Sequence, residues 1–149
     1  MEIRKMRRED AETVFAMMEV FYASDALLIH PDGETLRRTL EDCLEDGPYL
    51  EGFVFEEAGV IAGYTMVAKS YSTEAGGRCA WIEDIYVLPG YRGKGFGTAF
   101  LNFATEHYQK CAVRLRLEAE PDNRRAIQVY ENAGFEVLGY TQLVKSLKE

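Results

Sequence analysis

The sequence has little of what metal-centred, disulfide-stapled or membrane-spanning proteins require. Its three cysteines, Cys43, Cys79 and Cys111, lie far apart and lack CxxC spacing. An odd number in such positions argues against a disulfide framework and against a zinc site. No apolar run approaches the ~20 residues of a membrane span, and the first eight residues lack the apolar core of a secretory signal. We therefore expect a cytoplasmic protein without a bound metal.

Positive charge is also scarce. Lys and Arg number 17 against 25 Asp and Glu, for a net charge of −8. A nucleic acid or an anionic membrane would be repelled by this overall field, so we expect neither as a partner. The basic residues gather locally, at Arg92 and Lys94 and again at Arg124 and Arg125. This pattern favours a small anionic ligand on an acidic protein.

The stretch from Tyr91 to Thr98 concentrates three glycines and two cations. It follows a segment, residues 79–87, whose β-branched and aromatic content predicts a strand. It opens a segment whose apolar residues recur at helical spacing from Phe96 onward. Glycines allow close approach of the backbone to a ligand, and the free N–H groups of a helix start attract anions. The stretch therefore predicts a pyrophosphate cradle.

The spacing of the glycines within this stretch shows which of the known types of glycine loop it matches. A nucleotide P-loop would need lysine where Phe96 stands, and the dinucleotide fingerprint GxGxxG lacks its third glycine. The pattern that fits is Arg-x-x-Gly-x-Gly at Arg92, Gly95 and Gly97. It resembles the central motif of the GNAT superfamily of acetyl-CoA-dependent N-acetyltransferases. A glycine-rich turn with solvated cations is the alternative for the motif taken alone.

A second stretch strengthens the resemblance. Asn123, Ala126 and Tyr130, followed by Gly134 and Phe135, are similar to the second motif of the same family. The resemblance then covers essentially the whole of residues 1–149, taken as a single domain. It implies a mixed α/β fold of GNAT type, with a central mixed sheet of six to seven strands splayed in the middle and about four helices. It also implies a homodimer.

The periodicity predicts where these elements lie. The expected strands are residues 1–6, 53–55, 60–71, 79–87 and 113–119, with two closing strands within 135–147. The expected helices end near residues 24, 47, 110 and 133.

Transfer of an acetyl group to an amine requires an acceptor for the amine's proton, since an alkylamine titrates near ~10.4. The resemblance assigns that base to Glu83. Strand alternation predicts that Asp84 points to the opposite face, where it would hold a cationic substrate. Both can also be ordinary polar strand residues. Tyr130 matches the family's tyrosine that donates a proton to the leaving thiolate; a lone tyrosine would instead be read as a core aromatic.

The resemblance also implies the residues that bind acetyl-CoA. Backbone N–H groups at the end of the strand over residues 79–87 would hold the thioester and pantetheine, and the glycine loop would hold the pyrophosphate. The start of the helix after Asn123 would touch the pantetheine. Asn123 has a structural reading as well, as a helix N-cap. The expected cofactor-binding residues are Ile85, Tyr86, Val87, Arg92, Gly93, Lys94, Gly95, Phe96, Gly97, Thr98, Asn123 and Ala126.

The implied function is acetyl transfer from acetyl-CoA to a primary amine, by direct attack within a ternary complex. The acidic balance and the carboxylates from Glu41 to Asp46 favour a small cationic acceptor. Two alternatives remain open: a protein N-terminal or lysine acetyltransferase, and a non-catalytic module that binds acyl-CoA.

Overall fold

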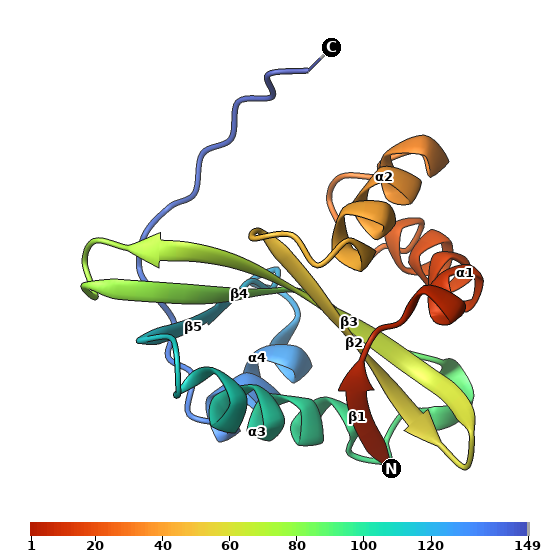
Figure 1. Cartoon of the computed structure of the whole chain (residues 1–149). Coiled ribbons are helices and arrows are strands. Elements are labelled where there is room, and N and C mark those ends of the chain that lie inside the picture. Colours follow the sequence, from red (N-terminus) through yellow and green to blue (C-terminus); the bar gives the residue numbers. More distant parts are fainter. Residues whose placement is uncertain (149) are drawn as a thin grey trace.

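A five-stranded sheet forms the centre of the computed structural model, which describes residues 1–148. The strands follow one another in chain order from β1 to β5, as Figure 1 shows. All neighbours are antiparallel except β4 and β5, which are parallel. The sheet is therefore mixed, as predicted. The strands are β1 (Glu2–Lys5), β2 (Leu50–Glu57), β3 (Val60–Ser72), β4 (Gly77–Val87) and β5 (Arg114–Leu117).

Four α-helices cover the two faces of the sheet (Figure 1). Helices α1 (Ala11–Tyr22) and α2 (Gly33–Leu44) pack on one face, where they enclose a core with Val54, Tyr64 and Met66. Helices α3 (Phe96–Tyr108) and α4 (Arg124–Asn132) pack on the other, against a second core rich in phenylalanine. Two short 3-10 turns, η1 (Arg8–Asp10) and η2 (Pro89–Tyr91), complete the order. The predicted number of helices is confirmed.

The sheet opens between β4 and β5. Their pairing ends at Ile82 and Leu117, so residues 83–87 of β4 have no strand partner on that side. The opposite side of β4 stays paired with β3 as far as Val87 and Gly63. Glycine is required at position 63, because a Cβ there would lie 2.2 Å from the carbonyl oxygen of Tyr86. The predicted splay is therefore present, and it lies directly before the glycine loop.

The prediction of two closing strands within 135–147 is wrong for this structure. Residues 135–148 form no helix or strand, and the tail runs away from the body (Figure 1). The sheet has five strands instead of six or seven for this reason. The tail has a composition typical of strands, but a strand also needs a neighbour to pair with.

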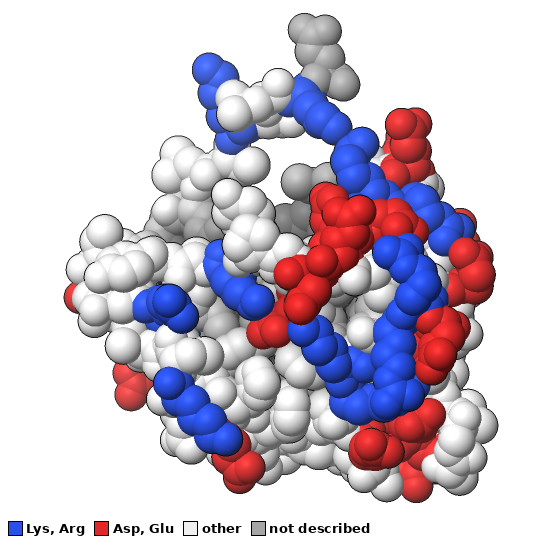
Figure 2. Space-filling model, viewed as in Figure 1, with Lys and Arg blue, Asp and Glu red and all other residues white. Residues whose placement is uncertain are grey.

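Charged side chains of both signs interleave over α1 and α2, on the right of the view in Figure 2. No helix within residues 1–148 combines the length and the apolar character needed to cross a membrane. No group of three or more His, Cys, Asp or Glu side chains within the same residues is arranged to hold a metal ion.

Candidate active site

The glycine loop connects the end of β4 to the start of α3. Gly93 and Gly95 adopt left-handed backbone conformations, with φ of +76° and +84°. Side chains other than glycine rarely adopt such values, so these two positions are fixed by backbone geometry. Gly97 lies in the first turn of α3 and has no such constraint. A Cβ at Gly97 would meet no atom within 4 Å. The chain itself therefore gives no reason for glycine at position 97.

The start of α3 presents free backbone donors. Its first helical hydrogen bond runs from the amide of Ala99 to the carbonyl of Gly95, at 2.9 Å, and no side chain caps the helix. The amides of Phe96, Gly97 and Thr98 therefore precede the first helical bond and point outward. Such a group of donors, together with the helix dipole, attracts a phosphate-like anion.

Arg92 and Lys94 flank these donors, but they are partly engaged. The Arg92 Nε donates to the carbonyl oxygen of Val87 at 2.8 Å, which fastens the loop to the end of β4. The ammonium of Lys94 lies 5.3 Å from the centre of the Tyr91 ring. The terminal nitrogens of Arg92 make no hydrogen bond to another residue of the described chain. They remain available to an anion at the start of α3.

A β-bulge in β4 changes the expected orientation of Asp84. Met66 of β3 pairs with Asp84 while its neighbour Val67 pairs with Ile82, so Glu83 is the extra residue. Before the bulge, Ile82 packs in the core beneath α3; after it, Tyr86 belongs to the core beneath α1 and α2. The prediction that Glu83 and Asp84 point to opposite faces is therefore wrong, because alternation holds only in an unbroken strand. Both side chains line one pocket.

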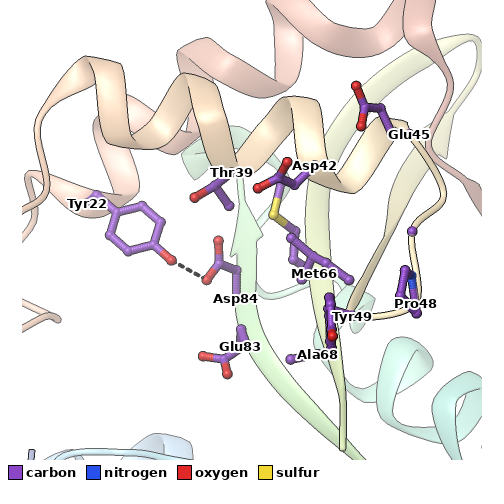
Figure 3. Close-up of a pocket in the computed structure, with 12 residues that line it drawn as sticks. Tyr22, Thr39, Asp42, Glu45, Pro48, Tyr49, Met66, Ala68, Glu83 and Asp84 are labelled. Atoms are coloured by element: carbon purple, nitrogen blue, oxygen red, sulfur yellow. Dashed lines mark hydrogen bonds between the residues drawn. The ribbon is translucent and has the colours of Figure 1, made fainter. Parts of the chain in front are cut away.

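Asp84 is 2% exposed and is held by two tyrosines. The hydroxyl of Tyr22 donates to its Oδ1 at 2.5 Å (Figure 3). The hydroxyl of Tyr64 donates to its Oδ2 at 2.9 Å. Burial raises the pKa of Asp84, while the two hydroxyl donors lower it, so that the net direction is upward. Burying a carboxylate lowers the stability of the folded chain unless hydrogen-bond donors replace the lost hydration.

Glu83 is exposed toward the same pocket. Partial removal from water is the largest cause that raises the pKa of Glu83. The carboxylates of Asp84 beside it and of Glu118, which directly follows β5, raise this pKa further. Two neighbouring carboxylates disfavour each other's charge, and a carboxyl with a raised pKa is a stronger base once it has ionised. Glu83 therefore combines a position near the splay with the basicity of a proton acceptor.

The pocket that these carboxylates line has a volume of about 580 Å³ (Figure 3). It lies between α2, the segment that follows α2, and strands β3 and β4. Four of its lining residues are acidic and none is Lys or Arg. Apolar and aromatic side chains supply most of the rest. The lining residues are Tyr22, Thr39, Asp42, Glu45, Gly47, Pro48, Tyr49, Leu50, Met66, Ala68, Glu83 and Asp84.

Tyr130 and Asn123 lie on α4, on the other face of the sheet. Asn123 caps this helix, its Oδ1 accepting from the amide of Ala126 at 3.2 Å. The half-buried Tyr130 packs against the same core as Ile85 and Val87, and its ring lies 6.3 Å from that of Phe135. Burial raises the pKa of Tyr130, and no hydrogen bond within residues 1–148 contributes to that rise. The hydroxyl is thus free to serve an incoming group.

The comparison with family models decides the class. Residues 12–135 match the model of the acetyltransferase (GNAT) family. The chain belongs to the GNAT acetyltransferase family. It is accordingly an acyltransferase, and the mixed sheet with its splay is the fold of this family.

Relatives of this GNAT chain agree. It is 28% identical to the mouse (Mus musculus) thialysine N-epsilon-acetyltransferase over 143 residues, which cover 89% of the chain and 82% of the mouse enzyme. Among solved structures, a possible acetyltransferase from Clostridium difficile 630 superposes with a TM-score of 0.85, at 22% identity, over 99% of this chain and 98% of the other. An aminoglycoside N-acetyltransferase solved with CoA superposes with a TM-score of 0.80, at 18% identity, over 99% and 95%.

Within this GNAT chain the predicted site residues fall into three places. The glycine loop and the open side of β4 adjoin each other, Glu83 and Asp84 share the acidic pocket, and Asn123, Ala126 and Tyr130 lie together on α4. Sequence reasoning missed the two tyrosines that hold Asp84. Tyr22 fell within the helix expected to end near residue 24, and Tyr64 within the strand expected over residues 60–71. Their hydroxyls were the only sign, since a buried tyrosine needs a hydrogen-bond partner.

Proposed function

We propose that this protein transfers the acetyl group of acetyl-CoA to the primary amine of a small cationic acceptor. The observation that carries the acceptor half is the acidic pocket, in which Asp42, Glu45, Glu83 and Asp84 surround a space without a cationic side chain. The acetyl-CoA half is supported by family membership, by the free donors at the start of α3 and by the CoA bound in the aminoglycoside N-acetyltransferase of the same fold.

The residues present fit acetyl-CoA along one path. The amides of Phe96, Gly97 and Thr98, with Arg92 and Lys94, would hold the pyrophosphate. Gly93 and Gly95 shape the loop that presents these amides. The unpaired edge of β4 from Ile85 to Val87 would hold the pantetheine amides, with Asn123 and Ala126 at the start of α4 near it.

The reaction assigns one role to each of three side chains. Asp84 and the outer carboxylates attract the charged acceptor, and Glu83 takes the proton of its ammonium, directly or through water. The freed amine attacks the thioester carbon, the nitrogen of the tetrahedral intermediate loses its second proton to water, and the intermediate collapses with cleavage of the carbon–sulfur bond. Tyr130 gives its hydroxyl proton to the departing thiolate, and solvent restores both groups. The products are the amide, CoA and one proton released to solvent.

Gly97 supplies a clean test of the pyrophosphate position. Gly97→Val should weaken CoA binding at least about tenfold in calorimetric titration, because a branched Cβ then occupies the space beside the amides that approach phosphate. The folded chain should tolerate it, since nothing lies within 4 Å of that Cβ. Arg92→Ala should weaken binding less, through loss of one charge-assisted contact.

The matched control is Gly33→Val, at the start of α2. Gly33 also has an open Cβ direction and no positive φ, but it lies at a different helix. It should bind CoA as the parent does. Equal CoA affinity in Gly97→Val, Arg92→Ala and the parent would place the pyrophosphate elsewhere.

The acceptor is tested by a screen for thiol release from acetyl-CoA with diamines, amino acids, aminoglycosides, neutral amines and peptides. A small amine that carries a second positive group should have the highest kcat/KM. Its advantage over an amine with an uncharged tail should shrink as salt shortens the Debye length to about 8 Å at physiological ionic strength. Preference for neutral or acidic acceptors would overturn the proposal, and turnover with peptides alone would support a protein acetyltransferase instead.

The pH dependence tests Glu83. The rate should rise with pH, because a protonated Glu83 cannot accept a proton and a protonated amine cannot attack. Glu83→Gln should shift the rising limb to higher pH and lower the plateau. An unchanged profile in this variant would remove Glu83 from the reaction.

A further inference from the structure

Two buried aspartates of this chain are held in opposite ways. Asp10 is 3% exposed, and the guanidinium of Arg4 donates to both of its carboxylate oxygens, at 2.9 and 3.0 Å. A cation in this position cancels the charge of the carboxylate, as in a structural ion pair. Asp84 is 2% exposed, and both of its side-chain donors, the hydroxyls of Tyr22 and Tyr64, are neutral. The fold therefore stabilises the charge of Asp84 without cancelling it.

The two hydroxyls leave part of the Asp84 carboxylate unused. An ionised carboxylate can accept about four hydrogen bonds, and the tyrosines supply one to each oxygen. The carboxylate points from β4 toward α2, across the acidic pocket (Figure 3). The backbone is fixed as well, because the hydroxyl of Thr65 donates to the carbonyl oxygen of Asp84 at 2.5 Å. The remaining acceptor positions are thus held in one orientation for a donor in the pocket.

No cation of the described chain competes for these positions. No lysine, arginine or histidine within residues 1–148 lines the pocket or belongs to the buried core around Asp84. His30 donates to the carbonyl oxygen of Tyr22 at 2.7 Å, outside the pocket lining. The titratable side chains that share the pocket or this core with Asp84 are Tyr22 of α1, Asp42 and Cys43 of α2, Glu45 and Tyr49 after α2, Tyr64 of β3, and Glu83 and Tyr86 of β4.

We propose that Tyr22 and Tyr64 are positioning residues for the acceptor, because their hydroxyls keep the buried Asp84 carboxylate charged and oriented to accept from the acceptor's ammonium. The inference rests on the proposed function, since it takes Asp84 as a group that binds the acceptor. In an exposed carboxylate water would supply this stabilisation, but burial excludes water from Asp84. Each hydroxyl therefore acts on the acceptor through Asp84.

The pH dependence of acceptor binding tests this role. Tyr22→Phe removes one donor to the charged form of Asp84, so the carboxyl should stay protonated to higher pH. The probe is cadaverine, an alkyl diamine, with acetyl-CoA saturating. Where only the variant is protonated, its KM should exceed that of the parent by about tenfold. The ratio of the two KM values should return toward one at higher pH, where Asp84 is ionised in both proteins, and kcat should change less than KM.

Tyr108→Phe is the matched control. The hydroxyl of Tyr108, on α3, donates to the buried carboxylate of Glu51, outside the pocket lining. This variant also removes a tyrosine donor from a buried carboxylate, but it should keep the parent's KM at every pH. Tyr64→Phe should repeat the effect of Tyr22→Phe from the other oxygen. A KM ratio for Tyr22→Phe that is the same at all pH values would show that Tyr22 only supports packing, and would overturn the proposal.

A second measurement needs no acceptor. In protein isotope-labelled at the side-chain carboxyl of aspartate, the NMR signal of Asp84 is assigned by its absence in Asp84→Asn. It should titrate at higher pH in Tyr22→Phe and Tyr64→Phe than in the parent and in Tyr108→Phe. The two possible failures are separate. An unshifted titration in an enzyme that acetylates cadaverine would overturn the role of the tyrosines alone, whereas no turnover of any cationic amine would overturn the proposed function.

Discussion

Replacing Tyr130 by phenylalanine should lower kcat roughly ten- to a thousandfold, which is close to the range for loss of one general acid. CoA affinity should be nearly unchanged. The ring would still pack against the core beneath α3, since only the hydroxyl is removed. No hydrogen bond within residues 1–148 contributes to the pKa of that hydroxyl, so its loss should leave Tm within about a degree.

This absence of a structural partner makes the experiment decisive. Burial raises the pKa of Tyr130, which keeps the phenol protonated until a thiolate forms beside it. Pre-steady-state kinetics should show that chemistry, and not product release, is slowed. Tyr71→Phe, at a tyrosine 66% exposed on β3, is the control and should be as active as the parent. Full activity of Tyr130→Phe would mean that solvent protonates the thiolate.

Asp84→Asn should raise the KM for a cationic acceptor about ten- to a hundredfold while making the protein more stable at neutral pH. The first effect follows from loss of a charged hydrogen-bond acceptor, worth about 1.5–3 kcal/mol. The second follows from the raised pKa of Asp84, which means that folding disfavours its charge. An amide of the same shape can still bond to the hydroxyls of Tyr22 and Tyr64.

The sign of the pH dependence is fixed by that raised pKa. Below the ordinary value of ~3.9, Asp84 is protonated in both the folded and unfolded chain, and the parent and the variant should differ little. As pH rises above it, the unfolded chain loses the proton before the folded chain does, and the parent loses stability relative to Asp84→Asn. Thermal unfolding at several pH values should show this gap widening up to the folded-state pKa.

Asp42→Asn is the matched control for both effects, because Asp42 lines the same pocket but is exposed. It should change Tm little and raise KM less. A parent protein that is more stable than Asp84→Asn at every pH would show that the Asp84 carboxylate stabilises the fold and is not held there at a cost for the acceptor.

The parts of the site that depend on local chemistry could be predicted from the sequence. The glycine loop is recognisable in the sequence because left-handed turns and close approach of the backbone require glycine. In the structure, Gly93 and Gly95 have positive φ. The cap of α4 by Asn123 is a similar local rule, and the structure confirms it. The helices and most of the strands could be predicted because the spacing of apolar residues within each segment depends on that segment alone.

The parts that depend on a distant partner could not be predicted. The bulge at Glu83 exists only in the register between β4 and β3, which a single strand does not encode. The bonds from Tyr22 and Tyr64 to Asp84 join residues 62 and 20 positions apart. The closing strands failed in the opposite way, because residues 135–147 have strand composition but no strand partner among residues 1–148.

The bulge determines which positions along β4 tolerate substitution. Before the bulge, Ala80 and Ile82 pack in the core beneath α3; after it, Ile85 and Val87 pack against the same core. A scan of all substitutions along the strand should therefore show a two-residue rhythm of tolerance whose phase slips once, at Glu83. Deleting that one residue would restore an unbroken rhythm and leave Ile82, Asp84 and Tyr86 on their present faces, so the extra position serves the pocket and not the packing of the two cores.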